Sequence, residues 1–318
     1  MSAIEILVLG SIHQDLVIRG PRLPEPGETV LGGQFYQVSG GKGANQAVAC
    51  CRAGNCPVWL CSAVGPDLLG QHALSQLADE GLVTEAIRES AQEATGVALI
   101  LVDQEGENCI SVASGANGLL AASDLPAATA SVWKAGNYLL ASLEVPWDTV
   151  SAALAQARAV NMATVLNPAP ATTELAQAGQ LKNVDLLTPN AQEASLITGI
   201  DVIDVPSARQ AAELLQGFGP RDVIVTLGQQ GLVLRQGEED IHIAAEPVEA
   251  VDTTAAGDCF NGALVAALAS GKSLSVAARW ANGAAALSVG HRGAQPSLPK
   301  QQEIERWWQT VERTGMGS

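Results

Sequence analysis

Short, continuous apolar runs alternate with alanine-rich helical stretches along most of this chain. Strands that are apolar throughout are buried on both faces, so the alternation predicts a mostly parallel sheet with helices on both sides. In such sheets the ligand binds beyond the carboxyl ends of the strands. We predict strands at Ile4–Leu9, Val58–Val64, Tyr138–Ala141, Ala163–Leu166, Val184–Leu187 and Val223–Leu227. We predict helices at Gly43–Ala53, Thr149–Val160, Ser207–Leu215, Cys259–Ala269 and Gln301–Val311, and a disordered tail at Gly315–Ser318.

Two segments, residues 13–38 and 95–114, interrupt this alternation. The first holds closely spaced prolines and glycines beside alternating runs such as Asp15–Arg19. The second is typical of a hairpin, with Val97–Val102 and Asn108–Val112 on either side of a turn. Together they predict a small β-sheet lid. The remaining residues, 1–12, 39–94 and 115–318, would form the α/β domain.

The composition argues against several classes of protein. The chain has 33 acidic against 17 basic residues, a net charge of −16, so neither nucleic acid nor an anionic membrane is an expected partner. No apolar run reaches the roughly 18 residues of a membrane span, and the first residues lack the basic region of a signal peptide. The six cysteines form no Cys-x-x-Cys pair, which argues against zinc and favours a reducing cytoplasm.

The run Asp252-Thr-Thr-Ala-Ala-Gly-Asp258 directly precedes the predicted helix Cys259–Ala269. A helix N-terminus presents free N–H groups and a partial positive charge, and small residues let an anion approach closely. Asp258 in the first turn could then take a proton from an alcohol that faces a bound phosphate. The alternative is that Asp252 or Thr254 caps the helix and Asp258 only complements its dipole.

A second run, Ser39-Gly-Gly-Lys42-Gly-Ala-Asn45-Gln46, places two glycines before a helix, where a ligand can approach the backbone. Lys42 and Asn45 are three residues apart and can face one site. The run is not a P-loop, because Gly43 stands where a Ser or Thr would hold magnesium. A plain glycine turn remains the alternative. Gly271-Lys-Ser273 is not a P-loop either, and Gly271 is predicted to end a helix.

Three further positions have a structural and a functional interpretation. Asn190 followed by Glu193 matches a helix capping box, or else contacts a ligand. Thr226-Leu-Gly228-Gln-Gln-Gly231 is a strand end and glycine turn that fits a nucleotide contact and a plain hairpin equally. Asp15, shortly after the first strand, can hold sugar hydroxyls or be a solvated loop acid.

In this order, these segments resemble the ribokinase-like (PfkB) carbohydrate kinases from roughly Ile4 to Leu298. Each run alone is moderately specific, but their joint occurrence is highly specific. The signature runs are Gly40–Ala47 and Asp252–Gly262, with weaker similarity at Gly115–Asn117, Leu143–Glu144, Leu166–Pro170 and Gly293–Ser297. The resemblance implies a Rossmann-like three-layer α/β/α sandwich and a β-sheet lid that often pairs into a homodimer.

The resemblance also implies an enzyme that transfers the γ-phosphate of ATP, as its Mg²⁺ complex, to the 5-hydroxyl of a small sugar, with ribose first. Asp258 would be the catalytic base, and the N–H groups of Ala255, Ala256 and Gly257 would form an anion hole. The sugar-binding residues would be His13, Asp15, Gly41, Lys42, Asn45, Glu144 and Asp258. The nucleotide-binding residues would be Asn190, Glu193, Thr226, Gly228, Gly231, Gly257 and Asn282, with Glu193 also organising magnesium through water.

Members of this family also bind K⁺, and the matching positions are Asp252, Thr254, Ser288, His291, Gly293 and Ser297. Two residues depart from the family pattern. His13 replaces an Asn and His291 replaces an Arg. Neutral His offers one donor and one acceptor in a larger ring, so deoxyribose, fructose or another small sugar stays open as the substrate.

Two other classes fit parts of the sequence. A catalytically silent sugar-binding regulator is possible, although Asp258, Lys42 and Glu193 are all present. A NAD-dependent dehydrogenase would share the α/β pattern, but no Gly-x-Gly-x-x-Gly follows the first strand.

Overall fold

The computed structural model describes residues 3–125 and 131–313, so the predicted tail lies outside the described residues. Within these ranges, the larger sheet has nine strands in the order β13-β12-β11-β10-β9-β8-β1-β4-β5. It is parallel from β5 to β11, and β12 and β13 are antiparallel. The predicted mostly parallel sheet is therefore confirmed. The strands are β1 (Ile6–Leu9), β4 (Val58–Val64), β5 (Ile87–Glu89), β8 (Tyr138–Ala141), β9 (Ala163–Leu166), β10 (Leu186–Leu187), β11 (Asp222–Thr226), β12 (Leu232–Gln236) and β13 (Glu239–Ile243).

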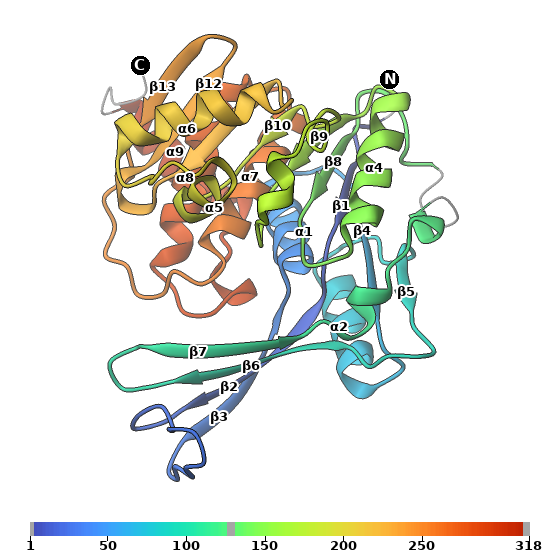
Figure 1. Cartoon of the computed structure of the whole chain (residues 1–318), viewed down its shortest axis with the longest axis vertical. Coiled ribbons are helices and arrows are strands. Elements are labelled where there is room, and N and C mark those ends of the chain that lie inside the picture. Colours follow the sequence, from blue (N-terminus) through green and yellow to red (C-terminus); the bar gives the residue numbers. More distant parts are fainter. Residues whose placement is uncertain (1–2, 126–130, 314–318) are drawn as a thin grey trace.

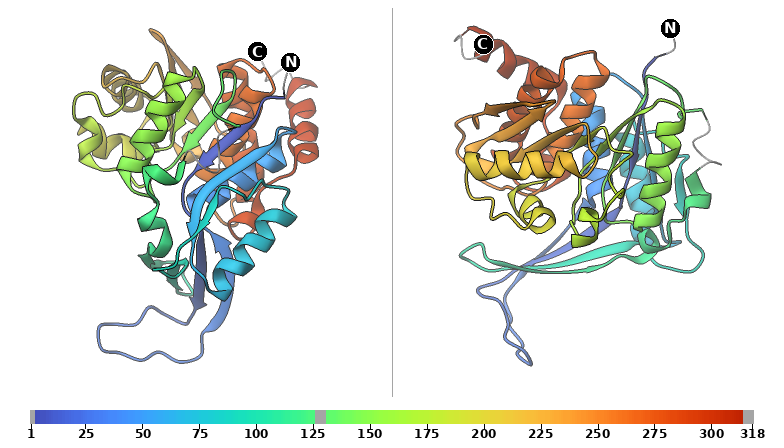
Figure 2. Two further views of the ribbon diagram at one scale, coloured as in Figure 1. Left: turned by 90° about the vertical axis from the view of Figure 1, so that its right-hand side faces the viewer. Right: turned by 45° about the horizontal axis from the view of Figure 1, so that its top comes forward.

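Helices cover both faces of this sheet, as Figures 1 and 2 show. One face carries α1 (Lys42–Ala53), α2 (Leu68–Asp79), α7 (Ala256–Ala269), α8 (Leu274–Val289) and α9 (Gln301–Arg313). The other carries α4 (Trp147–Ala159), α5 (Ala191–Thr198) and α6 (Val205–Gly217). Strand β1 shows why both faces are covered. Its Ile6 and Val8 enter one core while Leu7 and Leu9 enter the other, and all four are fully buried.

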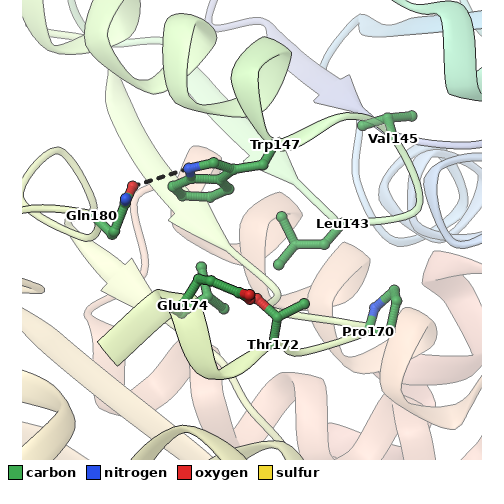
Figure 3. Close-up of a pocket in the computed structure, with 8 residues that line it drawn as sticks. Leu143, Val145, Trp147, Pro170, Thr172, Glu174 and Gln180 are labelled. Carbon is green, nitrogen blue, oxygen red and sulfur yellow. Dashed lines mark hydrogen bonds between the residues drawn. The ribbon is translucent and has the colours of Figure 1, made fainter. Parts of the chain in front are cut away.

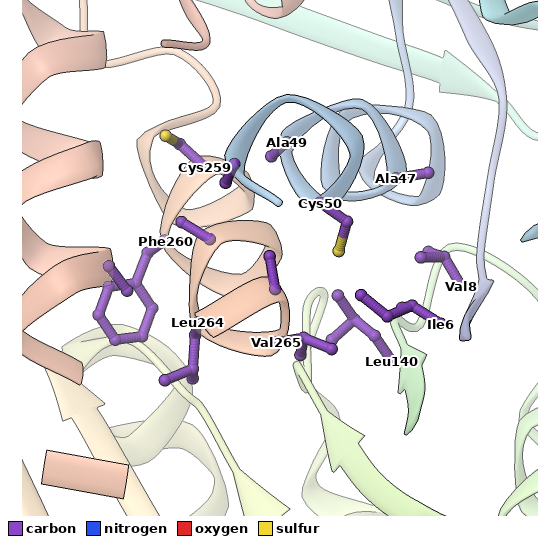
Figure 4. Close-up of a cluster of buried hydrophobic side chains, with 14 of the residues drawn as sticks. Ile6, Val8, Ala47, Ala49, Cys50, Leu140, Cys259, Phe260, Leu264 and Val265 are labelled. Carbon is purple, nitrogen blue, oxygen red and sulfur yellow. The ribbon is translucent and has the colours of Figure 1, made fainter. Parts of the chain in front are cut away.

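Helices α1 and α7 lie against each other at the centre of the first core (Figure 4). They touch along their backbones at Gly262. A Cβ atom there would lie 2.4 Å from the Cβ of Ala49 and 2.6 Å from the carbonyl oxygen of Gln46. This close packing brings the first turns of the two helices together, and those turns carry Asn45 and Asp258.

A smaller sheet projects from the α/β body (Figure 1). Its strands are β3 (Gln34–Gly40), β2 (His13–Arg19), β6 (Gly96–Val102) and β7 (Asn108–Ala113), in that order. The predicted second sheet is therefore confirmed. Side chains alternate between the two faces of a strand, so His13 and Asp15 lie on one face while Leu16 and Ile18 lie on the other.

Most differences from the predicted elements concern their ends. Helix α7 begins at Ala256, three residues before the predicted start, so Asp258 lies inside its first turn. Strand β10 covers only Leu186–Leu187. Short 3₁₀ helices, which the sequence did not predict, lie in the connections: η1 (Gly115–Leu119), η2 (Ala122–Asp124), η3 (Thr173–Ala176), η4 (Gly228–Gln230) and η5 (Gln295–Ser297).

Two structural interpretations of the sequence are confirmed. Asn190 and Glu193 form a capping box at the start of α5, with Asn190 Oδ1 accepting from the Glu193 N–H at 2.8 Å. Gly271 follows the end of α7 with φ at 86°, a left-handed conformation that suits glycine. Of the helices in the described ranges, none has the length and hydrophobicity needed to cross a membrane.

Candidate active site

A glycine turn sets the start of α1 directly against the end of β1. Gly41 has φ at 92°, and a Cβ atom there would lie 2.7 Å from the backbone nitrogen of His13 and 2.8 Å from the carbonyl oxygen of Ser11. Only glycine tolerates both the left-handed backbone and this contact. The first turn of α1, with Lys42 and Asn45, is thereby brought to the carboxyl edge of the sheet, where the alternation of strands and helices predicts the ligand.

The carboxylate of Glu144, just after β8, connects several segments at this edge. Its Oε2 atom accepts from the Lys42 backbone N–H at 2.9 Å and from the Ser11 hydroxyl at 2.5 Å. His13 Nδ1 lies 3.7 Å from the same oxygen. Burial lowers the pKa of His13, against the opposing effect of the Glu144 carboxylate. The predicted sugar-binding residues Lys42, Glu144 and His13 therefore do meet.

Asp258 is buried in the first turn of α7, with 7% of its surface exposed. Its Oδ2 accepts from Asn45 Nδ2 and its Oδ1 from Gln46 Nε2, each at 3.0 Å. Burial raises the pKa of Asp258, while the Lys42 ammonium and these two amide donors act to lower it. A carboxylate with a raised pKa near a helix N-terminus is suited to accept a proton.

Three buried polar atoms on residues of this site have no partner. Among the described residues, His13 Nε2, Asn45 Oδ1 and Gln46 Oε1 find no hydrogen bond. A buried polar atom without a partner costs free energy, on the order of 1–3 kcal/mol. A polar ligand bound here would restore these bonds.

Asp15, on β2, belongs to the same group of charges. Burial, with repulsion from Glu144 and Asp258, raises its pKa to about 6. Burial alone would lower the pKa of Lys42, but the carboxylates around it, with Asp258 first, raise it instead. The site thus holds the half-buried ammonium of Lys42 among several carboxylates.

A cavity of about 230 Å³ opens beside Asp258. It brings residues from both signature runs together with the capping box of α5 and the end of β11. Its lining residues are Lys42, Asn167, Ala169, Thr188, Asn190, Glu193, Thr226, Thr253, Ala255, Ala256, Gly257, Asp258 and Asn261. A Cβ atom on Gly257 would meet nothing within 4 Å, so the backbone here is open to a ligand.

The backbone at the start of α7 is unusual. Ala255 has φ at 60°, a left-handed conformation that costs an alanine about 1–2 kcal/mol. The Ala256 N–H donates to the Thr253 carbonyl oxygen at 3.2 Å. An anion bound at the predicted anion hole would therefore compete with one long internal hydrogen bond for that group.

The remaining predicted nucleotide-binding residues lie outside the lining of this cavity. Gly228 begins the η4 turn between β11 and β12, and Gly231 directly follows it. This turn joins the antiparallel hairpin that the sequence left as one alternative. Asn282, on α8, donates to the carbonyl oxygen of Ala244 at 2.8 Å.

Part of the predicted K⁺ set meets around Asp252. Its Oδ1 accepts from the Thr254 N–H at 2.9 Å and from the Thr254 hydroxyl at 2.6 Å, and its Oδ2 accepts from the Gly293 N–H at 2.9 Å. Ser288 and His291 lie at the C-terminal end of α8, joined by a bond from the His291 N–H to the Ser288 carbonyl oxygen. Ser297 lies in η5 and donates to Ala294.

The predicted site omitted several polar residues that the structure brings to it. Gln46 contacts Asp258, Ser11 contacts Glu144, and Asn167 and Asn261 line the cavity. Asn117 bonds both the N–H and the carbonyl oxygen of Ile12, at the start of the small sheet. Asn167 and Asn117 lie in the runs of weaker family similarity, Leu166–Pro170 and Gly115–Asn117. The family resemblance therefore marked these two segments in the sequence without marking the individual residues.

A separate, mainly apolar cavity of about 320 Å³ lies between the start of α4 and η3 (Figure 3). The Trp147 indole N–H donates to Gln180 Oε1 at 3.0 Å across it. Its lining residues are Leu143, Val145, Trp147, Pro170, Thr172, Glu174, Leu175 and Gln180, and none of these was predicted as a site residue.

The fold and this site together define a phosphotransferase that acts on a carbohydrate. The family model for pfkB carbohydrate kinases matches residues 3–301. The chain belongs to this family and is a sugar kinase, which excludes the silent-regulator and dehydrogenase alternatives.

Among proteins of this family, the chain is similar over nearly its full length to ribokinases. The chain is 43% identical over 300 residues to a ribokinase of Haemophilus influenzae, covering 94% of this chain and 96% of that protein. A ribokinase structure from Thermotoga maritima has a TM-score of 0.85 at 32% identity, covering 96% of this chain and 99% of the other. The Arabidopsis thaliana ribokinase complexed with ribose and ATP has a TM-score of 0.84 at 28% identity, covering 96% and 98%.

Proposed function

We propose that this sugar kinase transfers the γ-phosphate of ATP to the 5-hydroxyl of D-ribose, giving ribose 5-phosphate and ADP. The observation that carries the proposal is a pair of unpartnered buried atoms among the predicted sugar-binding residues, Asn45 Oδ1 and His13 Nε2. The Asn45 amide donates to the buried Asp258 carboxylate, and the His13 ring lies 3.7 Å from Glu144. Sugar hydroxyls both donate and accept hydrogen bonds, so one sugar can satisfy both atoms. The full-length similarity to ribokinases favours ribose among the sugars.

In this proposal Asp258 accepts the proton of the attacking hydroxyl. Asp15 and Glu144 accept hydrogen bonds from the other hydroxyls and orient the sugar. The backbone N–H groups at the start of α7 stabilise the negative charge that develops on the transferred phosphoryl group, and the Ala256 N–H gives up its long bond to Thr253 to do so. Lys42 adds a positive charge to the same cavity. These contributions are positioning and electrostatic stabilisation, which dominate phosphoryl transfer.

Magnesium would be held near Asn190 and Glu193, which line the same cavity as Asp258. Asn190 and Glu193 offer side-chain oxygen atoms, and oxygen ligands are what hard cations such as Mg²⁺ prefer. Burial raises the pKa of Glu193, and a nearby cation would favour its ionised form. The ion would neutralise charge on the ATP phosphates.

Potassium would be held around Asp252 by oxygen atoms. A carboxylate has about four lone-pair sites, and Asp252 uses three on Thr254 and Gly293. One site is left for a cation, which backbone carbonyls near Ser288 and Gly293 would help to hold. The ion would contribute positive charge beside the start of α7.

The small sheet is proposed to act as a lid and as the interface of a homodimer. The sheet registers place Ile18 opposite Phe35, and Leu16 opposite Leu99, on the face away from His13 and Asp15. Ile18, Phe35 and Leu99 are 44–64% exposed. A second copy would cover this apolar face. Phe35→Glu should convert a dimer to a monomer in sedimentation, while Leu196→Glu on α5 should not.

A cytoplasmic location is part of the same proposal, since all six cysteines are free thiols. An ADP-release assay with ribose, deoxyribose, fructose and adenosine, each with and without K⁺, tests the function. We expect ribose to give the highest kcat/KM. A higher value for deoxyribose would move the assignment to a deoxyribokinase, an alternative that His13 in place of Asn leaves open.

A further inference from the structure

The side-chain amide of Gln46 connects Asp258 to the rest of the sheet edge. Its Nε2 atom donates both to Asp258 Oδ1 at 3.0 Å and to Asn167 Oδ1 at 2.9 Å. All three side chains are buried, and Gln46 is fully so. Gln46 lies on α1, Asn167 follows β9 and Asp258 lies on α7, so this one amide joins three separate segments.

The direction of these hydrogen bonds is fixed by a backbone carbonyl. Asn167 Nδ2 donates to the carbonyl oxygen of Thr188 at 3.0 Å, and a carbonyl oxygen can only accept. The Oδ1 atom of Asn167 must therefore face Gln46, and Gln46 must donate to it with its NH₂ group. The same NH₂ group then faces Asp258. The Thr188 carbonyl thus determines, through two amides, that Asp258 receives a donor.

The connection returns to the first turn of α7 by a second path. The Thr188 hydroxyl donates to Asn261 Oδ1 at 2.6 Å, and Asn261 Nδ2 donates to the carbonyl oxygen of Gly257 at 2.9 Å. Gly257 directly precedes Asp258. The Asp258 carboxylate and its backbone are therefore both fixed relative to the loop after β10.

This arrangement leaves one atom unsatisfied. Among the described residues, the Gln46 Oε1 atom is buried without a hydrogen-bond partner. Turning the amide over would give no relief, because Oε1 would then face two oxygens, on Asp258 and Asn167. Burying Gln46 in the orientation that serves Asp258 therefore costs free energy, as is typical of a functional constraint.

We propose that Gln46, oriented by Asn167, is a positioning residue that holds the Asp258 carboxylate ionised and aimed at the cavity. The proposal rests on the proposed function, in which Asp258 accepts the proton of the sugar hydroxyl. Other charges also face Asp258: Lys42 from α1, Asp15 from β2, Glu144 after β8 and Glu193 from α5. In the part of the chain that the structure describes, none of these four side chains is hydrogen-bonded to the Gln46 side chain.

The test is Gln46→Met, which keeps the length and volume of the side chain and removes both donors. Loss of a buried hydrogen bond to a carboxylate should lower kcat roughly 10- to 100-fold. It should also raise the Asp258 pKa, so the acidic limb of the pH–kcat profile should move to higher pH. The dissociation constant for ribose should stay within about threefold, because the sugar contacts remain. A purely structural role would lower kcat without moving the acidic limb.

Two further variants keep the proposal open to refutation. Asn167→Leu keeps about the same volume, adds no charge and offers no oxygen to Gln46, so Gln46 loses the partner that orients it. This variant should move the acidic limb in the same direction by a smaller amount. The control is Gln216→Met, on α6, which also loses two donated hydrogen bonds but lies outside the site. It should leave the profile unchanged.

Titration of the Asp258 carboxyl carbon by ¹³C NMR gives a readout that needs no turnover. A higher apparent pKa in Gln46→Met than in the wild type supports the positioning role. An unchanged titration, with the acidic limb unmoved, overturns it. Absence of ADP release by the wild type with every sugar would sink the proposed function instead, and the NMR titration would still decide the role of Gln46.

Discussion

The side-chain amide of Asn45 donates to the carboxylate of Asp258 at 3.0 Å, although the two residues are 213 positions apart in the sequence. The two residues belong to the two signature runs. The other end of the same amide, Oδ1, is buried and has no partner among the described residues. A sugar hydroxyl bound to that oxygen would therefore be connected to the Asp258 carboxylate through a single side chain.

Asp258→Asn should abolish most turnover while sparing sugar binding. A general base contributes about 10²- to 10⁴-fold, so kcat should fall by that factor. The neutral side chain keeps the shape, but its NH₂ group must face either Asn45 or Gln46, which both donate. ADP release measures the first effect and calorimetry with ribose the second. Near-normal turnover in this variant would show that Asp258 is not the base.

Lys42→Met should shift the pH dependence of the reaction. The Lys42 ammonium lowers the pKa of Asp258, so its removal should raise that pKa and move the acidic limb of kcat to higher pH. A pH–rate profile followed from acidic to neutral pH records the position of this limb. Lys272→Met is the matched control, because that ammonium stacks on Trp280 away from the site. An acidic limb at the wild-type position in Lys42→Met would contradict the prediction.

Sugar affinity should depend on pH through Asp15. Its pKa is raised to about 6, first by burial and then by Glu144 and Asp258, so the side chain is ionised at pH 7 and protonated at pH 5. A carboxylate accepts stronger hydrogen bonds than a neutral acid, and the dissociation constant for ribose should rise roughly tenfold over this interval. Calorimetry without nucleotide isolates binding from catalysis. The Asp15→Asn variant should bind ribose weakly and without this pH dependence. If that variant kept the wild-type pH dependence, the dependence would come from another titratable group.

His13→Asn tests the basis of sugar choice. The family pattern has Asn at this position, and His13 Nε2 is among the buried atoms without a partner in the described chain. If His13 contacts a hydroxyl that deoxyribose lacks, the substitution should change the ratio of kcat/KM for ribose to kcat/KM for deoxyribose by about fivefold. This factor corresponds to the net free energy of about one hydrogen bond. An unchanged ratio would place the determinant of specificity elsewhere.

The sequence predicted the parallel sheet and the second sheet because both follow from local patterns. The apolar runs at Val58–Val64 and Tyr138–Ala141 match β4 and β8 residue for residue. The antiparallel β12–β13 edge was not predicted, because those strands carry charged residues such as Arg235 and Asp240 and so lack a continuous apolar run.

The candidate site was only partly predictable, for a different reason. Residues such as Lys42 and Asp258 carry charge beside glycines, which marks them in the sequence. Gln46 and Asn167 are neutral amides whose role comes from partners 121 and 212 residues away. No local pattern encodes which of many amides will be buried against a carboxylate.

Gly262 offers a test of how the helix packing supports the site. A Cβ atom there would come within 2.4 Å of Ala49 and 2.6 Å of the Gln46 carbonyl oxygen, so Gly262→Ala must push α1 away from α7. Overpacking of this kind costs about 1–3 kcal/mol of unfolding free energy. Because Asn45 and Gln46 lie on α1, the shift should also lengthen their bonds to Asp258, and kcat should fall together with the melting temperature.

Gly217→Ala, at the end of α6, is the control, since a Cβ atom there meets nothing within 4 Å and alanine favours a helix. Denaturant unfolding and ADP release on both variants measure the two effects, and a Gly262→Ala protein as stable and active as Gly217→Ala would refute the coupling.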